Sequence, residues 1–351
     1  MKIGIDISQI VYGTGVSLYT KSLVENLLKI DDTNEYILFG GSLRRKQDIL
    51  NIFPQAKVLP ISPVMADFIW NKLHVLPIDK LIGKVDVFHS SDWSEPPVDA
   101  FKVTTVHDLY PLKFPRMIDP MVREVHKRKL AWVFKESKRV IVPSNTTKDD
   151  LISYGMEESR IRVIPEAPNL TKASQDQVQK IKQKYNLKGD YVISIGVTKL
   201  KNTENIVKAF DLARSGRDIK LLLVGRPAGI KLDEVRNVRN LGFIESNELS
   251  PLLTGSKALV FPSIYEGFGV PILEAFKCEV PVVTSNYGSM LEVASNAAAL
   301  VDPYDVNSIA EGIEKALRGP KGLIEKGLER VKDFSWEKTA KMTLDVYNES
   351  K

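Results

Sequence analysis

The sequence predicts an α/β protein with two doubly wound, parallel-sheet domains. Short runs of β-branched residues alternate with helical patterns along most of the chain, as in parallel strands joined by crossover helices. A length of 351 residues suits two domains of about 100–200 residues each. A polar stretch over residues 166–190, punctuated by Pro165 and Pro168, separates two series of alternation. We therefore expect domains over residues 1–170 and 171–334, with ligands at the carboxyl ends of the strands.

Each element of the first domain follows from a local pattern. A helix between the first two strands is indicated by apolar residues at helical spacing, which would form one buried stripe. These residues are Val16, Tyr19, Leu23, Leu27 and Ile30. Ser144 or Asn145 is expected to cap a later helix that ends near Gly155. The expected strands are Lys2–Ile7, Tyr36–Phe39, Lys57–Pro60, Val85–His89, Lys102–Val106, Arg139–Pro143 and Arg160–Ile164.

The second domain begins after the linker with a polar segment, Lys172–Lys184, that permits a helix. A helix over Thr203–Leu212 and three helices from Val306 to the end of the chain are also expected. The strands expected between these helices are Tyr191–Ile195, Lys220–Val224, Asn240–Phe243, Ala258–Phe261, Pro281–Thr284 and Ala299–Val301.

Composition narrows the class of protein. The chain has 49 Lys and Arg against 44 Asp and Glu, and the excess is spread evenly, 23 against 21 through Leu170 and 26 against 23 beyond it. A protein that coats nucleic acid would concentrate its basic charge, so we expect no nucleic acid partner. One cysteine, Cys278, excludes an internal disulfide framework and a thiolate-rich zinc site. No long apolar run and no secretory signal are visible, which favours a cytoplasmic protein.

The segment Phe261–Ala275 carries the densest chemical motif. Gly267 and Gly269 lie just before a helix that Pro271 should begin and that should run to about Cys278, so exposed N–H groups and the helix dipole would favour an anion. Two carboxylates, Glu266 and Glu274, flank these glycines and suit sugar hydroxyls. Together they favour a diphosphate between two polyols, as in a nucleotide sugar. The alternative is a tight turn with two solvated glutamates.

A diphosphate also needs a cation. Lys199 and Lys201 follow the first strand of the second domain, at the end of the strand where ligands bind in α/β folds. Either lysine could neutralise a phosphate as a point charge. The alternative is a pair of surface lysines in a turn.

These motifs resemble the family 4 glycosyltransferases of the GT-B fold. Glu266 and Glu274 match that family's two glutamates separated by seven residues. Flanking segments that agree are Val224-Gly225, Leu241–Ile244, Pro281–Ser285, Leu300–Pro303 and Phe334–Glu337. The resemblance implies two Rossmann-like domains that face each other across a cleft, with a terminal helix over residues 335–351 crossing back to the first domain.

The amino-terminal half resembles the branch that includes bacterial polysaccharide mannosyltransferases. The segments that carry this likeness are Gly13–Val16, Thr105–Leu112, Val142–Thr146 and Arg160–Pro165. The resemblance implies a metal-independent enzyme without a cofactor, which transfers a hexose with retention of configuration by a same-face mechanism. GDP-mannose is favoured over UDP-sugars as the donor. The implied acceptor is a saccharide or a lipid-linked saccharide.

The same resemblance assigns roles to individual residues. Glu274 is expected at the nucleotide ribose, Glu266 at the donor sugar, and Lys201 at the diphosphate. His107 is expected to contact the donor sugar near the reacting carbon, and the alternative is a structural histidine at a strand end. Asp108 is also an acceptor candidate, although its residue type favours a helix or turn cap. The catalytic candidates are therefore His107, Lys201 and Glu266. The donor-binding candidates are Gly15, Gly196, Lys199, Lys201, Glu266, Gly267, Phe268, Gly269 and Glu274, and the acceptor candidates are Gly13, Thr14, Ser17 and Asp108.

The chain departs from the family pattern at three places. Val197 and Thr198 stand where the family usually has an arginine, so Lys199 is expected to substitute for it without the bidentate fork. Ser17 and Leu18 replace a glycine and an arginine of the first loop, and Glu166-Ala167-Pro168 replaces a commoner sequence at the hinge.

Two other functions and one partner surface stay open. A sugar-nucleotide epimerase would need acid and base carboxylates, for which Glu166 is the candidate, and the missing arginine would fit a non-catalytic sensor. A dehydrogenase is disfavoured, because the first loop lacks the third glycine of a dinucleotide-binding loop. Residues 123–139 carry seven Lys and Arg against two Glu, with aromatics, which suits an anionic membrane surface at the inner face of the membrane. The alternative is a solvated helix with Trp132 in the core.

Overall fold

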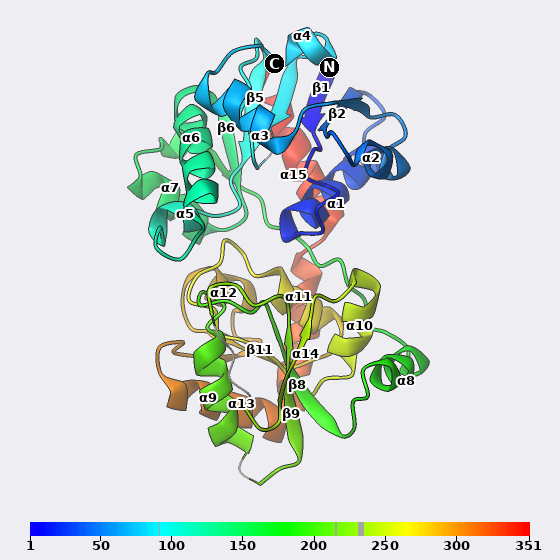
Figure 1. Cartoon of the computed structure of the whole chain (residues 1–351), viewed down its shortest axis with the longest axis vertical. Coiled ribbons are helices and arrows are strands. Elements are labelled where there is room, and N and C mark those ends of the chain that lie inside the picture. The colour runs from blue at the N-terminus through cyan, green and yellow to red at the C-terminus, as the bar shows by residue number, and fades with distance from the viewer. Residues whose placement is uncertain (91, 215, 231–234) are drawn as a thin grey trace. The chain divides into compact units, whose positions relative to one another are not determined.

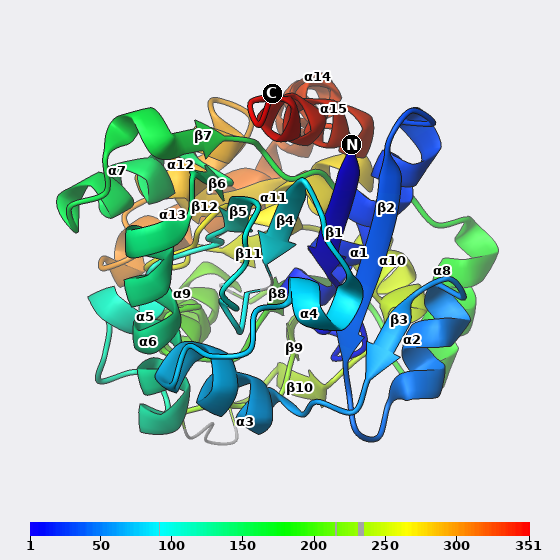
Figure 2. The same cartoon turned by 90° about the horizontal axis from the view of Figure 1, so that it is seen from above.

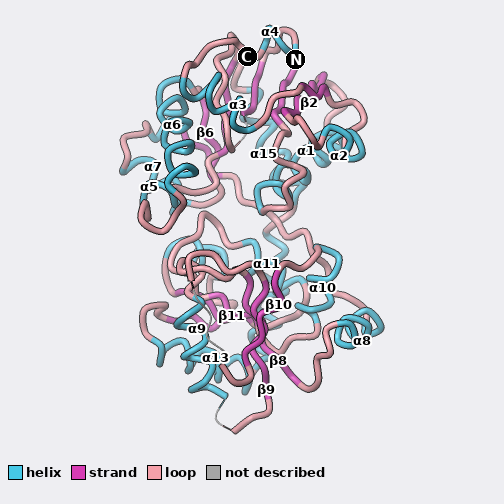
Figure 3. The backbone as a smooth tube through the Cα atoms, in the orientation of Figure 1, coloured by secondary structure: helices cyan, strands magenta, loops and turns pink. Residues whose placement is uncertain are grey.

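The computed structural model describes residues 1–351 except 91, 215 and 231–234. The chain forms two compact units, which we call the first unit (Met1–Glu166 with Ser335–Lys351) and the second unit (Ala167–Phe334) (Figure 1). The division falls after Glu166 rather than after Leu170. Each unit contains one parallel sheet with helices on both faces (Figure 3), so the predicted α/β class is confirmed.

The first unit contains a seven-stranded sheet in the order β3-β2-β1-β4-β5-β6-β7, which can be followed from strand to strand in Figure 2. All of its neighbouring strands are parallel, and Ile3 of β1 pairs with Tyr36 of β2 on one side and Val87 of β4 on the other. The strand order reverses between β1 and β4, which is where open α/β sheets bind ligands. The strands are β1 (Lys2–Asp6), β2 (Glu35–Gly41), β3 (Lys57–Leu59), β4 (Val87–Ser90), β5 (Phe101–Thr105), β6 (Arg139–Val142) and β7 (Ile161–Val163).

Helices cover both faces of this sheet, and the last helix of the chain is one of them. Helix α15 packs along α1, and it contributes Ala340, Val346 and Tyr347 to the core beside β1. The helices are α1 (Gly15–Ile30), α2 (Lys46–Ile52), α3 (Pro63–Ala66), the π-helical turn η1 (Asp67–Lys72), α4 (Asp79–Ile82), α5 (Tyr110–Lys113), α6 (Pro120–Glu136), α7 (Asn145–Ser153), the 3₁₀ turn η2 (Glu158–Arg160) and α15 (Trp336–Asn348).

The second unit contains a six-stranded parallel sheet in the order β10-β9-β8-β11-β12-β13, which reverses between β8 and β11. Alternate residues of its strands enter two different apolar clusters, so both faces are buried. The strands are β8 (Asp190–Ile195), β9 (Ile219–Val224), β10 (Val238–Gly242), β11 (Leu259–Phe261), β12 (Val282–Ser285) and β13 (Ala299–Val301). The helices are α8 (Gln175–Lys184), α9 (Thr203–Arg214), α10 (Ser246–Thr254), α11 (Val270–Lys277), α12 (Gly288–Ala294), α13 (Val306–Arg318), α14 (Pro320–Arg330) and the 3₁₀ turn η3 (Val331–Asp333).

All of the predicted strands and long helices are present, and local chemistry explains where several begin. Thr14 caps α1 in a reciprocal box with Ser17. Ser144, rather than Asn145, caps α7 by accepting a hydrogen bond from the N–H of Thr147. Pro271 occupies the second position of α11, because that helix begins at Val270. The short helices between β2 and β4 and after β5 were not predicted, since one or two turns leave no periodic pattern to detect.

Candidate functional site

The site of the second unit lies at the point where its strand order reverses. The loop after β8, residues 196–202, and the loop after β11, residues 262–269, are joined there by a hydrogen bond of 2.8 Å from the N–H of Ile264 to the carbonyl of Leu200. Parallel strands bring their carboxyl ends to one edge, so the predicted lysines and glutamates meet at this edge.

Lys201 and Glu266 form an ion pair. Lys201 Nζ lies 2.5 Å from Glu266 Oε1 and 4.8 Å from the centroid of the Phe261 ring. Gly196 makes room for the lysine, because a Cβ at Gly196 would lie 2.7 Å from Lys201 Cγ, and its φ of +89° is itself a glycine conformation. The residue after β8 is therefore a glycine, which leaves room for the aliphatic part of the Lys201 side chain to pass toward Glu266.

The glycine loop leads into α11 as predicted. Gly269 is the N-cap with φ 111° and ψ 46°, and within the described part of the chain no side chain caps this end of α11. The side chain of Phe268 is buried and packs edge to face on Phe334, with 5.9 Å between ring centroids. Burial of this ring fixes the backbone of the loop, while the helix dipole favours an anion at its end.

Glu274 is the fifth residue of α11, just beyond its first turn, and is only 6% exposed. Burial raises the pKa of its carboxyl group to about 7, although a hydrogen bond from the backbone N–H of Asn169 opposes the shift. Because this carboxyl group is already out of water and has a pKa near 7, it can accept hydrogen bonds from hydroxyl groups with little further desolvation cost.

The two lysines of the preceding loop differ in their surroundings. Lys199 is exposed, whereas Lys201 is partly buried beside Glu266. Asn202, the last residue of the loop after β8, is buried with φ +61°. It donates hydrogen bonds to the carbonyls of Pro262 (3.1 Å) and Pro303 (2.6 Å). The sequence analysis missed Asn202, and its place after Lys201 at the start of a helix was the available signal.

A row of hydroxyl groups holds the loop 262–269, which we call the glutamate loop. The sequence analysis did not predict these contacts. Four hydroxyl side chains in and just after β12 each donate a hydrogen bond to a carbonyl in or after β11. The pairs are Thr284 with Phe261, Ser285 with Ser263, Tyr287 with Ile264, and Ser289 with Glu266, at 2.6–2.9 Å. The signal was the density of Ser, Thr and Tyr over residues 284–289.

The site of the first unit centres on His107, directly after β5. Its Nδ1 lies 3.1 Å from Glu166 Oε1, and its ring meets the edge of Tyr19 with 4.5 Å between centroids. Burial lowers the pKa of His107, but the hydrogen bond and charge of Glu166, with smaller contributions from Asp92 and Asp108, outweigh burial and raise it. The structure thus pairs two residues that the sequence analysis had considered separately.

A second histidine behind His107 is part of the core. His89 is buried, and its ring nitrogens lie 2.7 Å from the Tyr347 hydroxyl and 2.9 Å from the Thr105 hydroxyl. Burial, with the positive charge of Lys129, lowers the pKa of His89 to about 3, so this ring is neutral. It connects α15 to the strand that carries His107.

The first loop supplies few free side chains. Thr14 and Ser17 cap α1, and the hydroxyl of Ser17, which is 2% exposed, also donates to the carbonyl of Gln9 at 2.6 Å. Gly13 and Gly15 have open space where a side chain would be. Asp108 accepts a hydrogen bond from the N–H of Tyr110 at 2.8 Å, as a turn cap does.

A cavity of about 410 Å³ opens beside this loop, at the carboxyl ends of β1 and β2. Its lining includes Gln9, Thr14, Trp70, Asp92, Trp93 and His126. Gln9 and Asp92 also line a small space of about 20 Å³ next to His107. Asp92, whose pKa is lowered by His126, Lys129 and His107 against the effect of burial, was not predicted, although it follows a strand end.

The basic segment 123–139 comprises most of α6, the two residues after it and the first residue of β6. Arg128 pairs with Asp67 at 2.6 Å, and Lys129 is buried. Trp132 stacks on His74 with 3.4 Å between ring centroids. Trp132, Arg128 and Lys129 thus make contacts within the first unit and do not all face solvent. Among the described residues, no helix is long and apolar enough to span a bilayer.

Comparisons with known proteins bear on both units. Residues 13–172 match the family described as Glycosyltransferase Family 4, and residues 176–332 match Glycosyl transferases group 1. The serotype-specific mannosyltransferase WbdA of Escherichia coli is 28% identical over 269 residues, which cover 70% of this chain and 33% of WbdA. The O-antigen chain mannosyltransferase B of Escherichia coli is 40% identical over 113 residues, covering 31% of this chain and 30% of its own length. The chain spans about a third of these curated relatives.

Solved structures share the fold. Sucrose-phosphate synthase from Thermosynechococcus elongatus superposes with a TM-score of 0.75 at 19% identity, covering 99% of this chain and 98% of the other. Anabaena HepE, in complex with UDP and glucose, has a TM-score of 0.73 at 15% identity and covers 99% and 100% of the two chains. The two sequence families between them span both units, and the chain belongs to the group 1 and family 4 glycosyltransferases, enzymes of the GT-B fold.

Proposed function

We propose that this enzyme transfers a hexose, with mannose favoured, from a nucleotide-diphosphate sugar to an acceptor hydroxyl. The observation that carries the proposal is the Lys201–Glu266 pair at the N-terminus of α11, one to two turns from the buried Glu274. An ammonium group beside a helix N-terminus suits a diphosphate, and a carboxylate on either side suits the hydroxyls of a sugar and a ribose. GDP-mannose leads UDP-sugars as donor, because two relatives are named mannosyltransferases.

The second unit would then lower the barrier to loss of the diphosphate. Negative charge develops on the leaving phosphate oxygen as the bond to the anomeric carbon breaks. Lys201, which has donors to spare beyond Glu266, and the α11 amides would stabilise that charge as it forms. Lys199, exposed at the rim, would add a second cation in place of the usual arginine. Gly196 and the loop Gly267–Gly269 would shape the site.

We propose retention of configuration without a metal or other cofactor. Glu266 is already paired with Lys201, which suits hydrogen bonding to donor hydroxyls better than nucleophilic attack. The leaving phosphate oxygen would accept the acceptor's proton on the same face of the sugar. Anomeric analysis of the product would check retention, and activity that survives EDTA would check metal independence.

The first unit would bind the acceptor and complete the donor contacts. His107, held by Glu166, would donate a hydrogen bond to the donor sugar near the reacting carbon, and Gly15 would leave room for the diphosphate. The cavity beside Gly13 and Thr14 would suit a saccharide, because its lining includes the aromatic ring of Trp93 and the carboxylate of Asp92, which can accept hydrogen bonds from hydroxyl groups. Ser17 is committed to the cap of α1, so we place it and Asp108 behind the acceptor rather than against it.

The proposed acceptor is a saccharide or a lipid-linked saccharide in the cytoplasm, and a lipid-linked acceptor would place the enzyme at the inner face of the membrane. The exposed lysines of segment 123–139 would then approach anionic lipid. No nucleic acid is part of this proposal.

The decisive experiment measures release of nucleoside diphosphate from a panel of nucleotide sugars, with and without saccharide acceptors. A transferase releases it in an acceptor-dependent manner, with GDP-mannose preferred. Conversion of the donor alone into another nucleotide sugar would favour an epimerase built on His107 and Glu166. Binding without any turnover would favour a sensor.

A further inference from the structure

Residues 63–76, which we call the apolar segment, present most of their large apolar side chains to solvent. The segment comprises α3, η1 and the four residues that follow them. Six large apolar side chains in it are between 41% and 72% exposed. They are Val64, Met65, Phe68, Leu73, Val75 and Leu76. Single exposed apolar residues are ordinary, but six within thirteen positions form a patch of the kind that marks a binding surface.

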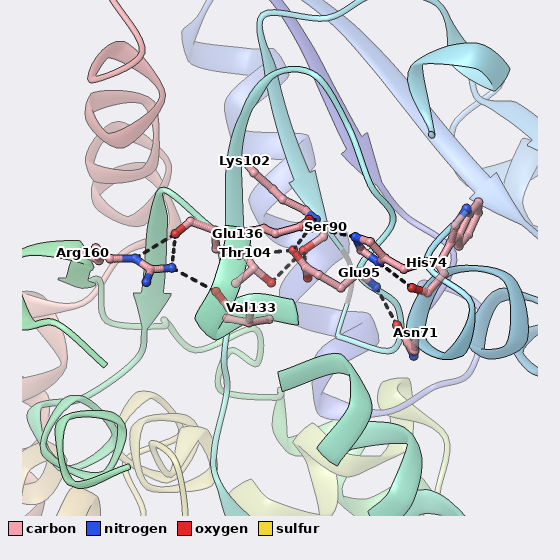
Figure 4. Close-up of polar contacts among 11 residues, drawn as sticks. Asn71, His74, Ser90, Glu95, Lys102, Thr104, Val133, Glu136 and Arg160 are labelled. Carbon is pink, nitrogen blue, oxygen red and sulfur yellow. Dashed lines mark hydrogen bonds and ion pairs between the residues drawn. The ribbon is translucent and has the colours of Figure 1, made fainter. Parts of the chain in front are cut away.

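Two polar side chains of the same segment, Asn71 and His74, face the protein instead. Asn71 is 3% exposed, accepts a hydrogen bond from the N–H of Glu95 at 3.0 Å and donates to the carbonyl of Trp93 at 3.0 Å. His74 Nε2 lies 2.8 Å from Glu136 Oε1. Figure 4 shows Asn71 and His74 turned toward the buried network of Glu95, Lys102 and Glu136. Asn71 and His74 thus lie on the inner side of the segment with the buried Ala66 and Trp70, while the six apolar side chains lie on the outer side with the exposed Lys72.

The conformation of the apolar segment is held by contacts on its inner side. Trp70 is 1% exposed, and its Nε1 donates to the carbonyl of Leu76 at 3.0 Å. The backbone at His74 and Leu76 lies in the left-handed region, with φ of +53° and +59°, which side chains other than glycine rarely adopt. Because anchors on the inner side impose this conformation, Leu73, Val75 and Leu76 are displayed outward rather than collapsed onto the core.

The charges around the patch are positive. The carboxylate of Asp67 is paired with Arg128, and Glu136 is paired with Lys102 and His74. Lys72 is exposed, with its Nζ 5.6 Å from the centroid of the Phe68 ring. Lys135 of α6 is exposed over Trp132, which itself stacks on His74. An apolar surface edged by exposed lysines complements the headgroups and outer acyl region of an anionic bilayer.

We infer that the apolar segment is the surface by which the first unit lies on an anionic lipid bilayer. The bilayer is the favoured occupant because the edge charges match its headgroups. It is also favoured because Pro63, Ala66 and Trp70 of the segment line the cavity of about 410 Å³ on their other side. A bilayer there lets a membrane-anchored molecule reach that cavity. The inference moves the principal membrane contact from residues 123–139 to residues 63–76, with α6 contributing cations.

Vesicle co-sedimentation of the full chain tests the inference without donor or acceptor, so its outcome is independent of the proposed transfer activity. The wild type is expected to co-sediment with vesicles of phosphatidylglycerol and phosphatidylethanolamine, and more weakly with phosphatidylcholine alone. The double variant Val64→Ser, Phe68→Ser should partition at least about tenfold more weakly, because two large apolar side chains no longer leave water. The matched control is Leu43→Ser, another exposed apolar side chain of the first unit (56% exposed), which should bind like the wild type.

A single-site label gives a second readout. Cys278 is buried, and burial raises the pKa of its thiol to about 11, so a new exposed cysteine can be labelled selectively. An environment-sensitive dye on Val64→Cys should shift to the blue with anionic vesicles, and the same dye on Leu43→Cys should not. Wild-type protein that stays in the supernatant, or equal dye shifts at both positions, would overturn the inference. A wild-type dimer in sedimentation velocity that Val64→Ser, Phe68→Ser dissociates would overturn it in favour of a second copy of the chain.

Discussion

Two glutamates from one motif lie in opposite environments in the second unit. Glu266 is paired with Lys201 at 2.5 Å, so its charge is balanced in the absence of any ligand. Glu274 is buried in α11, and its carboxyl group accepts a hydrogen bond from the backbone N–H of Asn169. Glu266 is thus held in position by Lys201. Glu274 is buried before any ligand binds, and its burial lowers the stability of the free protein when the group is ionised.

That cost can be measured by the substitution Glu274→Gln. The folded pKa of about 7 lies above the ordinary 4.5, so the folded state keeps a proton that the unfolded state loses between these pH values. The contribution of Glu274 to the stability of the wild type should therefore be most favourable below about pH 4.5 and fall as pH rises to about 7, by up to about 3 kcal/mol at about 1.4 kcal/mol per pH unit. The glutamine variant should lack this slope in chemical denaturation.

The same variant should bind nucleotide more weakly, by about tenfold or more, because a neutral amide replaces a charged acceptor for ribose hydroxyls. The variant should thus be more stable at pH 8 and less able to bind donor. Equal stability of the two proteins at pH 5 and at pH 8 would contradict the buried, shifted carboxyl group described here.

Lys201→Ala tests the charge at the leaving group. Removing one preorganised donor to a developing negative charge costs about 10²–10³ in turnover, and the variant also leaves Glu266 without its partner. We expect kcat to fall in this range in the nucleoside diphosphate release assay, while Lys199→Ala, at the exposed neighbour, should cost much less. A larger loss from Lys199→Ala would reverse the assignment of the two lysines.

At the scale of elements, the row of hydroxyl groups fixes where the glutamate loop lies. Ser289→Ala removes the hydrogen bond of 2.7 Å to the carbonyl of Glu266 and should cost about 1–2 kcal/mol of stability, because that carbonyl loses its partner. Its kcat should also fall, by about tenfold, since small displacements of positioned groups slow catalysis.

Ser256→Ala is the matched control for this prediction. Ser256 also donates a buried hydrogen bond of 2.7 Å to a carbonyl of the second unit, that of Leu253, but it is not part of the glutamate loop. It should lose similar stability in thermal unfolding and keep wild-type kcat. A normal kcat for Ser289→Ala would show that the loop holds its place without this hydroxyl.

The elements also show what the sequence could predict. Strands and long helices were found because buried parallel strands are continuous apolar runs and helices repeat every three to four residues. The meeting of Lys201 with Glu266 followed from the rule that strand ends share an edge. The pairing of His107 with Glu166, the cap role of Ser17 and the row of hydroxyls depend on side-chain directions across distant loops, which no local pattern reports.

At the scale of the whole molecule, the chain passes between the units twice, after Glu166 and after Phe334. Near the first passage, Glu166 bonds to His107 in the first unit, and the N–H of Asn169 bonds to Glu274 in the second. At the second passage, Phe334 packs on Phe268 in the second unit. At each of these two places, residues near the boundary thus contact candidate site residues of a unit. The connecting segments therefore help to position those site residues as well as joining the units.

Because α15 completes the core of the first unit, residues of α15 should control the stability of a unit most of whose other residues lie before Ala167. Tyr347 is fully buried beside α1 and β1, and its hydroxyl lies 2.7 Å from His89. Tyr347→Ala should destabilise the first unit by about 3–5 kcal/mol through the cavity it leaves. Tyr347→Phe, which loses only the hydrogen bond, should cost about 1 kcal/mol.

Calorimetry with nucleotide separates the units in this last prediction. Nucleotide that binds the second unit raises the transition of that unit by mass action. In Tyr347→Ala, the transition of the first unit should shift down while the nucleotide-dependent shift of the second unit stays at its wild-type size. Loss of the nucleotide-dependent shift in Tyr347→Ala would mean that the second unit depends on α15 for its own fold, contrary to the division of the chain at Phe334.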